Sequence, residues 1–468
     1  MQQIDCQANP AHTRSHQRHA WVVLTLALAQ MVSACGGGGG VSPAPIPTPT
    51  PTPTPKAWQG AALIETDDTS GAGSARIAMD TSGNTIAVWL QSNGTRDSVW
   101  ANRYDASAAA WGTAKLLETS DTDDVYEPQV AVDANSNAMA VWLQFDGMQT
   151  SIWATRYTPS TGWGTPTLVD SESGNADGVQ IAMDDIGNAI AAWQQIDGSL
   201  VKLRSNRYTG STGWGTATAV IDNGNAVPFM PQIAVDASGN AIAVWRQFDG
   251  ENRDIVANRY TVGSGWGTAG LIETTNEIAD VPEIAMDASG NAMAVWQQFD
   301  GTHFDIWANR YTASTGWGTA TLVETSKGSA SLPQIALDAS GNAMAVWQQS
   351  DGIQVNIWAN RYNASTSAWG TPVLVEADNV GNAREPQIAM DANGNAIAVW
   401  SQFDGALLNS WTNRYTSGVG WGAPVLLETN QAGDAFKPQI AMNASGNAVA
   451  VWRQLGNAIS SIWANVFR

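Results

Sequence analysis

Apolar and polar positions follow one pattern that recurs along most of the chain. Its most regular marker is a tryptophan at the end of an apolar run, as in "AMAVW", and successive copies lie 51 to 53 residues apart. The eight members are Trp89, Trp142, Trp193, Trp245, Trp296, Trp347, Trp400 and Trp452. Self-similarity at one fixed period is the signature of a repeat architecture, in which each copy buries its apolar face against its neighbours. We therefore expect eight equivalent structural units between residues 57 and 468.

One repeat is predicted to form four short β-strands separated by turn residues. In the fifth copy these are residues 283–287, 291–298, 305–311 and 316–325. "DASGN" joins the first two, and its Asp and Gly suit a tight hairpin turn. The second segment, "NAMAVWQQ", is almost wholly apolar, whereas a strand in a sheet with one wet face would alternate. Four strands per unit and a sheet covered on both faces predict an all-β fold, an eight-bladed β-propeller.

The two ends of the repeat region complement each other. Residues 57–66 form an isolated fourth-strand segment, and residues 461–468 end the chain on a third-strand segment. The opening strand can therefore complete the last blade, which closes the ring and leaves no exposed strand edge. A β-solenoid is the alternative fold, although its coils are usually shorter than this period.

Several residues recur in nearly every copy, and structural roles are expected for most of them. Asp and Asn of "DASGN" are expected to cap the turn, with calcium ligation as the alternative. The tryptophans are expected to pack between blades, with sugar stacking as the alternative. The arginine of "NRY" is expected to form an ion pair or bind backbone, and the glutamine two residues after the marker tryptophan to satisfy buried polar groups.

Two resemblances accompany this repeat. The spacing in "DASGN" loosely resembles the Asp-box of sialidase-type propellers, but it lacks the Ser-x-Asp opening and places Asn after Gly. That resemblance implies a propeller and carries no activity to this chain. The blades are also similar to those of repeat lectins, at the level of their tryptophan content only.

The first 34 residues have the layout of a secretory signal. Arg14 and Arg18 precede the apolar run "WVVLTLALA", which is too short for a permanent membrane-spanning helix. The "VSAC" that ends at Cys35 resembles the lipobox of bacterial lipoproteins. The resemblance implies cleavage before Cys35 and lipidation of that cysteine. Because Gly36 follows rather than Asp, it also implies an outer-membrane or cell-surface location, with the lipid as the only membrane contact.

Residues 35–56 follow as a linker of glycines and then alternating Pro and Thr. Glycine-rich chain is flexible, and Pro/Thr chain favours extended polyproline II. We expect three parts: a signal peptide over 1–34, a lipidated stalk over 35–56 and the propeller over 57–468.

Composition narrows the chemistry of the folded part. The formal charge of −20 argues against nucleic acid as a partner, because nucleic acid is bound through clustered Lys and Arg. Both cysteines, Cys6 and Cys35, lie in the leader region, so neither a disulfide nor a thiolate metal site is expected in the propeller. No cofactor is expected, apart from the calcium alternative above.

No catalytic constellation stands out in the sequence. His303 is the only histidine beyond the leader, and neither a phosphate-binding glycine loop nor a zinc-spaced cluster occurs. The loops are short and even in length, whereas an enzyme usually breaks such symmetry with long singular loops. The sequence therefore predicts that the chain is not an enzyme.

The loops on one face of the ring vary between copies. In a four-stranded meander, connections two–three and four–one share a face, and these are the unlike segments, such as "TRDS", "THFD" and "SDTDDVYE". Functional loops usually gather on one face of a rigid scaffold. The candidate binding residues on this face are Asp121, Asp123, Asp124, Tyr126, Phe229, Met230, Arg253, His303 and Phe304.

Three functions fit these observations. The preferred one is a surface-exposed binding or scaffold propeller that recognises a protein or a glycan through its variable face. The first alternative is a multivalent lectin with repeated sites between blades, since many similar copies provide avidity. The second alternative is a glycosidase- or lyase-like enzyme with its site at the channel mouth.

Overall fold

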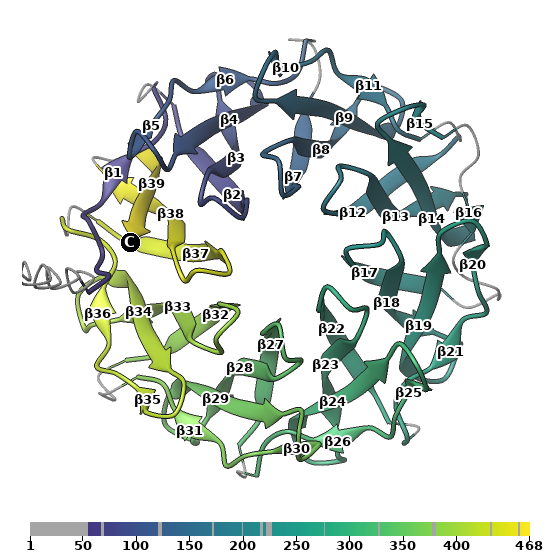
Figure 1. Cartoon of the computed structure of the whole chain (residues 1–468), viewed down its shortest axis with the longest axis vertical. Helices are drawn as coiled ribbons and strands as arrows, with labels where there is room; N and C mark the ends of the chain where they lie inside the picture. Colours follow the sequence, from purple (N-terminus) through teal and green to yellow (C-terminus); the bar gives the residue numbers. More distant parts are fainter. Residues whose placement is uncertain are drawn as a thin grey trace, which may run out of the picture. The chain divides into compact units, whose positions relative to one another are not determined.

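The computed structural model describes residues 55–66, 70–119, 124–170, 173–198, 200–215, 219–220, 227–275, 277–325, 328–376, 381–430, 433–456 and 459–468. The predicted signal peptide, Cys35 and the linker up to residue 54 lie outside the described residues. The unit Pro55–Arg468 is a ring of eight antiparallel sheets, which confirms the eight-bladed β-propeller (Figure 1). In the part of the chain that the structure describes, no helix is long and apolar enough to cross a membrane.

Each blade contributes its strands outward from the ring centre in chain order (Figure 1). The innermost strands of blades 1 to 8 are β2 (Ala72–Met79), β7 (Val125–Val132), β12 (Asn175–Met183), β17 (Val227–Val235), β22 (Ala279–Met286), β27 (Ala330–Leu337), β32 (Ala383–Met390) and β37 (Ala435–Met442). The second strands are β3 (Thr85–Ser92), β8 (Ala138–Phe145), β13 (Ala189–Asp197), β18 (Ala241–Phe248), β23 (Ala292–Phe299), β28 (Ala343–Ser350), β33 (Ala396–Phe403) and β38 (Ala448–Gly456).

The third strands follow in the same order and carry the outer strands. They are β4 (Asp97–Asp105), β9 (Thr150–Thr158), β14 (Leu200–Thr209), β19 (Arg253–Thr261), β24 (Phe304–Thr312), β29 (Val355–Asn363), β34 (Leu408–Thr416) and β39 (Ile459–Phe467). The outer strand of blades 1 to 7 is a pair of short pieces: β5 (Ala110–Trp111) and β6 (Lys115–Leu116), β10 (Gly162–Trp163) and β11 (Thr167–Leu168), β15 (Gly213–Trp214) and β16 (Ala219–Val220), β20 (Gly265–Trp266) and β21 (Gly270–Leu271), β25 (Gly316–Trp317) and β26 (Thr321–Leu322), β30 (Ala368–Trp369) and β31 (Val373–Leu374), and β35 (Gly420–Trp421) and β36 (Val425–Leu426).

The outer strand differs from the continuous segment predicted over 316–325. Trp317 pairs with Tyr311, and Thr321 pairs with Ala308. Between these two pairs the outer strand advances by four residues while β24 advances by three. The outer strand therefore has one extra residue, which interrupts the hydrogen-bonded ladder and divides it into β25 and β26.

Closure of the ring follows the prediction. In the eighth blade, β1 (Ala62–Leu63) pairs with β39, with Ala62 opposite Ala464. A bridge between Trp58 and Phe467 extends this contact, and Ile64 is 1% exposed in the core beside it. The opening segment thus supplies the outer strand that the last blade lacks.

The eight marker tryptophans form the centre of the packing between blades. Each is 0% exposed, and each packs within a cluster that joins two adjacent blades. In every blade the indole Nε1 donates to Oε1 of the glutamine two residues later; the bond from Trp296 to Gln298 measures 2.9 Å. The glutamine amide then donates onward, as Gln298 does to Thr275 at 2.7 Å. The recurring glutamine thus serves mainly the tryptophan, because a buried N–H without an acceptor is costly.

The repeated turn is held by its aspartate. Asp287 Oδ1 accepts from the backbone nitrogens of Ser289 and Asn291 at 2.9 and 3.0 Å, and its Oδ2 accepts from Asn291 Nδ2 at 2.9 Å. Gly290 has a φ of 82°, which suits glycine in this turn. The capping role expected for Asp and Asn is therefore observed.

The repeated arginine binds the next blade. Arg310 donates from Nη1 to the carbonyl oxygen of Gly341 at 2.7 Å, and its guanidinium lies 5.3 Å from the centre of the Tyr362 ring. Backbone binding, as expected, is combined here with a cation–π contact.

Candidate functional site

The innermost strands share a backbone distortion near their beginnings. Each has a bulge, and in seven blades a residue other than glycine takes a positive φ of 50–55° there. The eight positions, called the inner rim below, are Ser74, Glu127, Gly178, Met230, Val281, Leu332, Glu385 and Lys437. The bulges lie at the end of the blade that carries the variable loops between the second and third strands. Strained backbone of this kind is common at functional sites, and here the side chains differ from blade to blade.

Two adjoining cavities lie beside one part of the inner rim. The first, of about 270 Å³, lies between blades 8 and 1. The second, of about 500 Å³, runs from blade 1 across blade 2 to blade 3. Ser74 and Leu90 line both cavities. The two together therefore form one elongated depression, called the rim groove below.

The blade 8 end of the rim groove is cationic. Arg76, Lys437 and Arg453 line the first cavity, together with the single carboxylate of Asp97 among the described lining residues. Burial lowers the pKa of Arg76, while Glu283 and Glu127 raise it. Burial also raises the pKa of Asp97, with repulsion from Asp124 adding to the effect. Three cationic groups so close together are notable in a chain with a formal charge of −20.

The blade 3 end of the rim groove is aromatic and acidic. Tyr126, Glu127 and Asp177 line the second cavity, and the side chain of Tyr126 is 44% exposed. Packing between the blades raises the pKa of Glu127, and the neighbouring charge of Asp177 raises it further. Glu127 Oε2 accepts a hydrogen bond from the backbone nitrogen of Gly178 at 3.1 Å. A carboxyl group of this kind beside a second one suits proton transfer.

A polar ring lies one step deeper along the innermost strands. Six of its eight positions are glutamine, while blade 1 has Arg76 and blade 5 has Glu283. Burial raises the pKa of Glu283 to about 7, although Gln334 and Arg76 act in the opposite direction. Gln232 donates to Glu283 Oε1 at 3.3 Å. Arg76 thus belongs both to this ring and to the rim groove.

The residues predicted for the site are spread around the variable face. Tyr126 lines the rim groove on blade 2. Phe229 and Met230 belong to blade 4, where the ring of Phe229 lies 4.7 Å from the guanidinium of Arg246. Arg253 of the same blade is 3.5 Å from Asp280 of blade 5. Asp124 precedes β7, and Asp121 and Asp123 lie outside the described residues.

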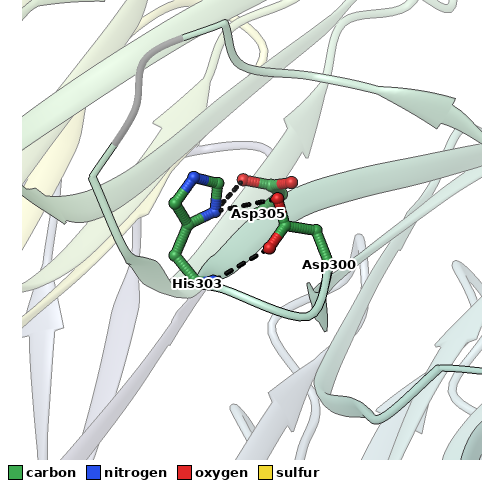
Figure 2. Close-up of side chains that lie close together, drawn as sticks. All are labelled: Asp300, His303 and Asp305. Carbon is green, nitrogen blue, oxygen red and sulfur yellow. Dashed lines mark hydrogen bonds and ion pairs between the residues drawn. The ribbon is translucent and has the colours of Figure 1, made fainter.

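His303 and Phe304 come from blade 5. Phe304 packs against Phe299 with ring centres 5.3 Å apart. Figure 2 shows the carboxylates of Asp300 and Asp305 on the same side of the His303 ring, with its Nδ1 3.3 Å and 3.1 Å from their oxygens. These three are, within the described residues, the group whose ligand types and spacing could hold a metal ion.

Blades 6 and 7 explain how this blade 5 cluster arises. There an asparagine occupies the place of Asp305 and donates to the turn aspartate, as Asn409 does to Asp404 at 2.8 Å. In blade 5 an aspartate at that place cannot donate, and Nδ1 of the His303 ring lies close to both carboxylates instead. Local compensation between like charges therefore accounts for the cluster.

A further cavity lies on the outer side of blades 1 and 2. It measures about 520 Å³ and is lined by Arg103, Lys115, Tyr157 and Trp163 among others. It is the feature closest to the interblade sugar sites expected of a lectin.

Sequence reasoning missed the residues that make the rim groove, apart from Tyr126. Glu127 and Lys437 end segments that were recognised as variable, "SDTDDVYE" and "NQAGDAFK", but were not chosen as candidates, and Arg453 lies in a strand that was assigned to the scaffold. The signal was present in the innermost strands, where the residue two positions before "QIAM" or its equivalent differs between most copies and is glutamate in blades 2 and 7. Strand residues of this kind were overlooked because variation was sought in loops.

Comparison with known proteins shows the fold and no closer relationship. No protein-family model and no curated protein matches the chain. Among solved structures it is similar to the polysaccharide lyase Uly1, with a TM-score of 0.51 and 12% identity over 72% of this chain and 88% of that one. It is also similar to a PL25 ulvan lyase, with a TM-score of 0.50 and 8% identity over 75% of this chain and 94% of that one.

These likenesses overturn the prediction that the chain is not an enzyme. Both solved structures with this fold are named as polysaccharide lyases. The prediction was based on short, even loops and on the scarcity of histidine. Neither feature excludes catalysis, because the strand residues at the inner rim supply carboxyl, hydroxyl and guanidinium groups without long loops or histidine. The chain thus shares its propeller fold with solved polysaccharide lyases, and the fold gives no ground for excluding catalysis.

Proposed function

We propose that the chain recognises a glycan that lies along the rim groove. The observation that carries this proposal is the continuity of two cavities across blade 1, through Ser74 and Leu90. An elongated, concave surface that combines polar and apolar groups suits a chain of sugar rings better than a compact ligand. Tyr126 adds an exposed aromatic face, and Asp177 and Asn175 add hydrogen-bonding groups.

A second function, acid–base chemistry on the bound glycan, is favoured by one specific observation. Glu127 has a raised pKa, and Asp177 and Tyr126 line the same cavity. A carboxyl group that remains protonated to a higher pH than usual is suited to donate a proton to a leaving oxygen. Glu127 is the proposed acid in this scheme, and Asp177 keeps its pKa raised.

Binding along the groove is tested by a glycan array followed by titration of the best ligand, each with and without calcium. Truncation of Tyr126 to Ala is expected to weaken binding by about tenfold, since a lost aromatic contact costs about 1.4 kcal/mol. The matched control is Ser331→Ala, at the same strand position in blade 6, which lies away from the groove. Equal affinity of the Tyr126→Ala variant and the wild type would contradict the proposal.

The stoichiometry of the same titration separates the groove from a lectin mode. One glycan per chain is expected for the rim groove. Several sites per chain, with binding unaffected by Tyr126→Ala, would instead favour sites between blades such as the cavity beside Trp163. Capture of a protein with no glycan bound would favour the scaffold function.

We propose that a lipid anchor at Cys35 attaches this glycan-binding unit to the membrane. The "VSAC" segment supports this anchor, and an outer-membrane or cell-surface location in a bacterium is part of the same proposal. Metabolic labelling with palmitate is expected to mark the wild type, whereas Cys35→Ala is expected to lose both the label and the membrane fraction. An unlabelled wild type would refute the anchor.

A further inference from the structure

We propose that Arg453, Lys437 and Arg76 form a pocket for an anionic substituent of a sugar, a carboxylate or a sulfate. This inference rests on the proposed function, because it assigns the blade 8 end of the rim groove to one charged group of the bound glycan.

The argument starts from two equivalent arginines in opposite parts of the ring. Arg246 in blade 4 and Arg453 in blade 8 each follow the marker tryptophan of their blade. Each lies over a phenylalanine of the neighbouring strand, Phe229 at 4.7 Å and Phe436 at 5.1 Å. The two guanidinium groups are therefore held in the same way by their own blades.

The two arginines differ in the contact that they make with the next blade. Asp280 of blade 5 accepts from Arg246 Nη1 through both carboxylate oxygens, at 2.9 and 3.1 Å. The residue at the place of Asp280 in blade 1 is Gly73. Among the described residues, no carboxylate lies within ion-pair distance of Arg453, whereas Arg246 has Asp280. The Nε of both arginines is buried without an acceptor, so the two sites differ in the carboxylate at Nη1. The same arginine site thus occurs twice in this protein, once with a carboxylate of the next blade bound to the guanidinium (the filled site) and once without one (the unfilled site).

The unfilled site has room for a ligand. The first cavity of the rim groove, of about 270 Å³, lies against Arg453, Gly73 and Ser460. Ser460 occupies the place that Arg253 has beside Asp280 in the filled site. Two large or charged side chains are thereby replaced by small ones, which opens the cavity.

The remaining charges around the cavity favour an anion. Lys437 and Arg76 line it together with Arg453, and Asp97 is the carboxylate on its wall. Glu127 and Glu283 act on Arg76 from outside this lining, so the excess of positive charge in the cavity comes mainly from Arg453 and Lys437 facing Asp97. A guanidinium fork matches a carboxylate or a sulfate through two parallel hydrogen bonds, so either group fits the chemistry. An uncharged sugar would leave Arg453 without its acceptor.

The two equivalent sites allow a test by exchange. Gly73→Asp would place a carboxylate beside Arg453, as Asp280 stands beside Arg246. The substitution is expected to fold, because Gly73 does not have a positive φ and an added Cβ would lie 3.6 Å from Arg453 Cδ. Asp280→Gly is the reciprocal change and would free Arg246. Thermal melting of both variants checks that the blades are intact.

The probes are glucuronate and inorganic sulfate, titrated calorimetrically into the propeller at fixed ionic strength, with glucose as the neutral control. The wild type is expected to bind at least one anion at least tenfold more tightly than glucose, at one site. Gly73→Asp is expected to weaken that binding by tenfold or more, and Asp280→Gly to add a second site. The stronger of the two anions identifies the substituent.

The outcomes distinguish this inference from the proposed function. Equal anion binding by the wild type and a folded Gly73→Asp variant would overturn the pocket, even if a neutral glycan still bound along the groove. No preference of the wild type for either anion over glucose would also overturn it. Anion binding that Gly73→Asp abolishes, with no glycan bound on an array, would support the pocket and refute the proposed function.

Discussion

The carboxylate of Glu127 in blade 2 accepts a hydrogen bond from the backbone nitrogen of Gly178 in blade 3, at 3.1 Å. Both residues occupy the bulge of their innermost strand. The side chain at one inner-rim position therefore binds the backbone of the next position. Glu127 is thus fixed beside Asp177, where its pKa is raised.

This placement predicts a specific loss of activity in Glu127→Gln. If Glu127 donates the proton, turnover of the bound glycan is expected to fall about 100-fold or more, while glycan affinity changes little. Wild-type activity is expected to decline as the pH rises through the raised pKa of Glu127, since the acid must be protonated. Measuring released chain ends against pH tests both statements.

The matched control for this prediction is Glu385→Gln. Glu385 is the glutamate at the bulge of blade 7, outside the rim groove. It is expected to keep wild-type turnover. Equal loss in both variants would mean that the effect is structural, and an active Glu127→Gln variant would exclude Glu127 as the acid.

Glu283 predicts a dependence of stability on pH. Its pKa is raised to about 7 in the folded ring, above the value of 4.5 for an unperturbed glutamate. The folded state therefore holds this proton more tightly than the unfolded state, so its contribution favours folding at low pH. That contribution is lost as the pH rises from 4.5 to about 7 and stays lost above it.

Glu283→Gln tests this dependence with the residue that six other blades already use. At pH 8 the variant is expected to be more stable by about 3 kcal/mol, a value that already includes the attraction between Arg76 and the ionised Glu283. Near pH 4 the two proteins are expected to have similar free energies of unfolding. Denaturant titration at both pH values measures the difference, and an equal difference at both would refute the assignment.

Gln298→Leu is predicted to destabilise the ring without leaving a large cavity. The substitution removes the acceptor of the buried Trp296 Nε1 and the donor to Thr275. An unsatisfied buried N–H costs about 1–3 kcal/mol, so a loss of about 2 kcal/mol in the free energy of unfolding is expected. Ser314→Ala in an exposed turn of the same blade is the control and is expected to have no effect. A stable Gln298→Leu variant would mean that the indole finds another acceptor.

Ring closure predicts a strong effect of removing the opening strand. A chain that begins at residue 67 loses the pairing with β39, the buried Ile64 and the bond from the nitrogen of Ile462 to Glu65. It is expected to lose at least about 3 kcal/mol of stability and to self-associate through the exposed strand edge. A chain that begins at residue 55 is the control. Light scattering and denaturation compare the two, and a stable monomer that begins at residue 67 would contradict closure by β1.

The architecture could be predicted from the sequence because the pattern of one blade occurs eight times along the chain. Each copy carries the same buried tryptophan, seven of the eight carry the turn aspartate, and the strand missing at one end is present at the other. The break in the outer strand could not be predicted, because it depends on register between β24 and its partners. The order of strands and the closure of the ring were thus available before any coordinates.

The candidate site, in contrast to the architecture, was only partly predicted from the sequence. Tyr126 was found because it differs from its counterparts in a variable segment. Lys437 was not chosen although its segment, "NQAGDAFK", varies between copies, and Arg453 was not found because it lies in a strand whose repeated pattern indicates scaffold. The formal charge of −20 gave no hint of a cationic cavity, because it describes the whole chain and not one site.

The sequence by itself determined the eight blades, their strand order and the closure, because those properties repeat locally and need only neighbouring residues to be read. Only the tertiary structure decided which of the residues that differ between copies lie next to one another. Gly73 and Arg453 stand near opposite ends of the propeller sequence, and closure of the ring brings them together across one blade interface. Whether an arginine there has a carboxylate or an open cavity depends on a contact between blades, which no single copy of the repeat contains.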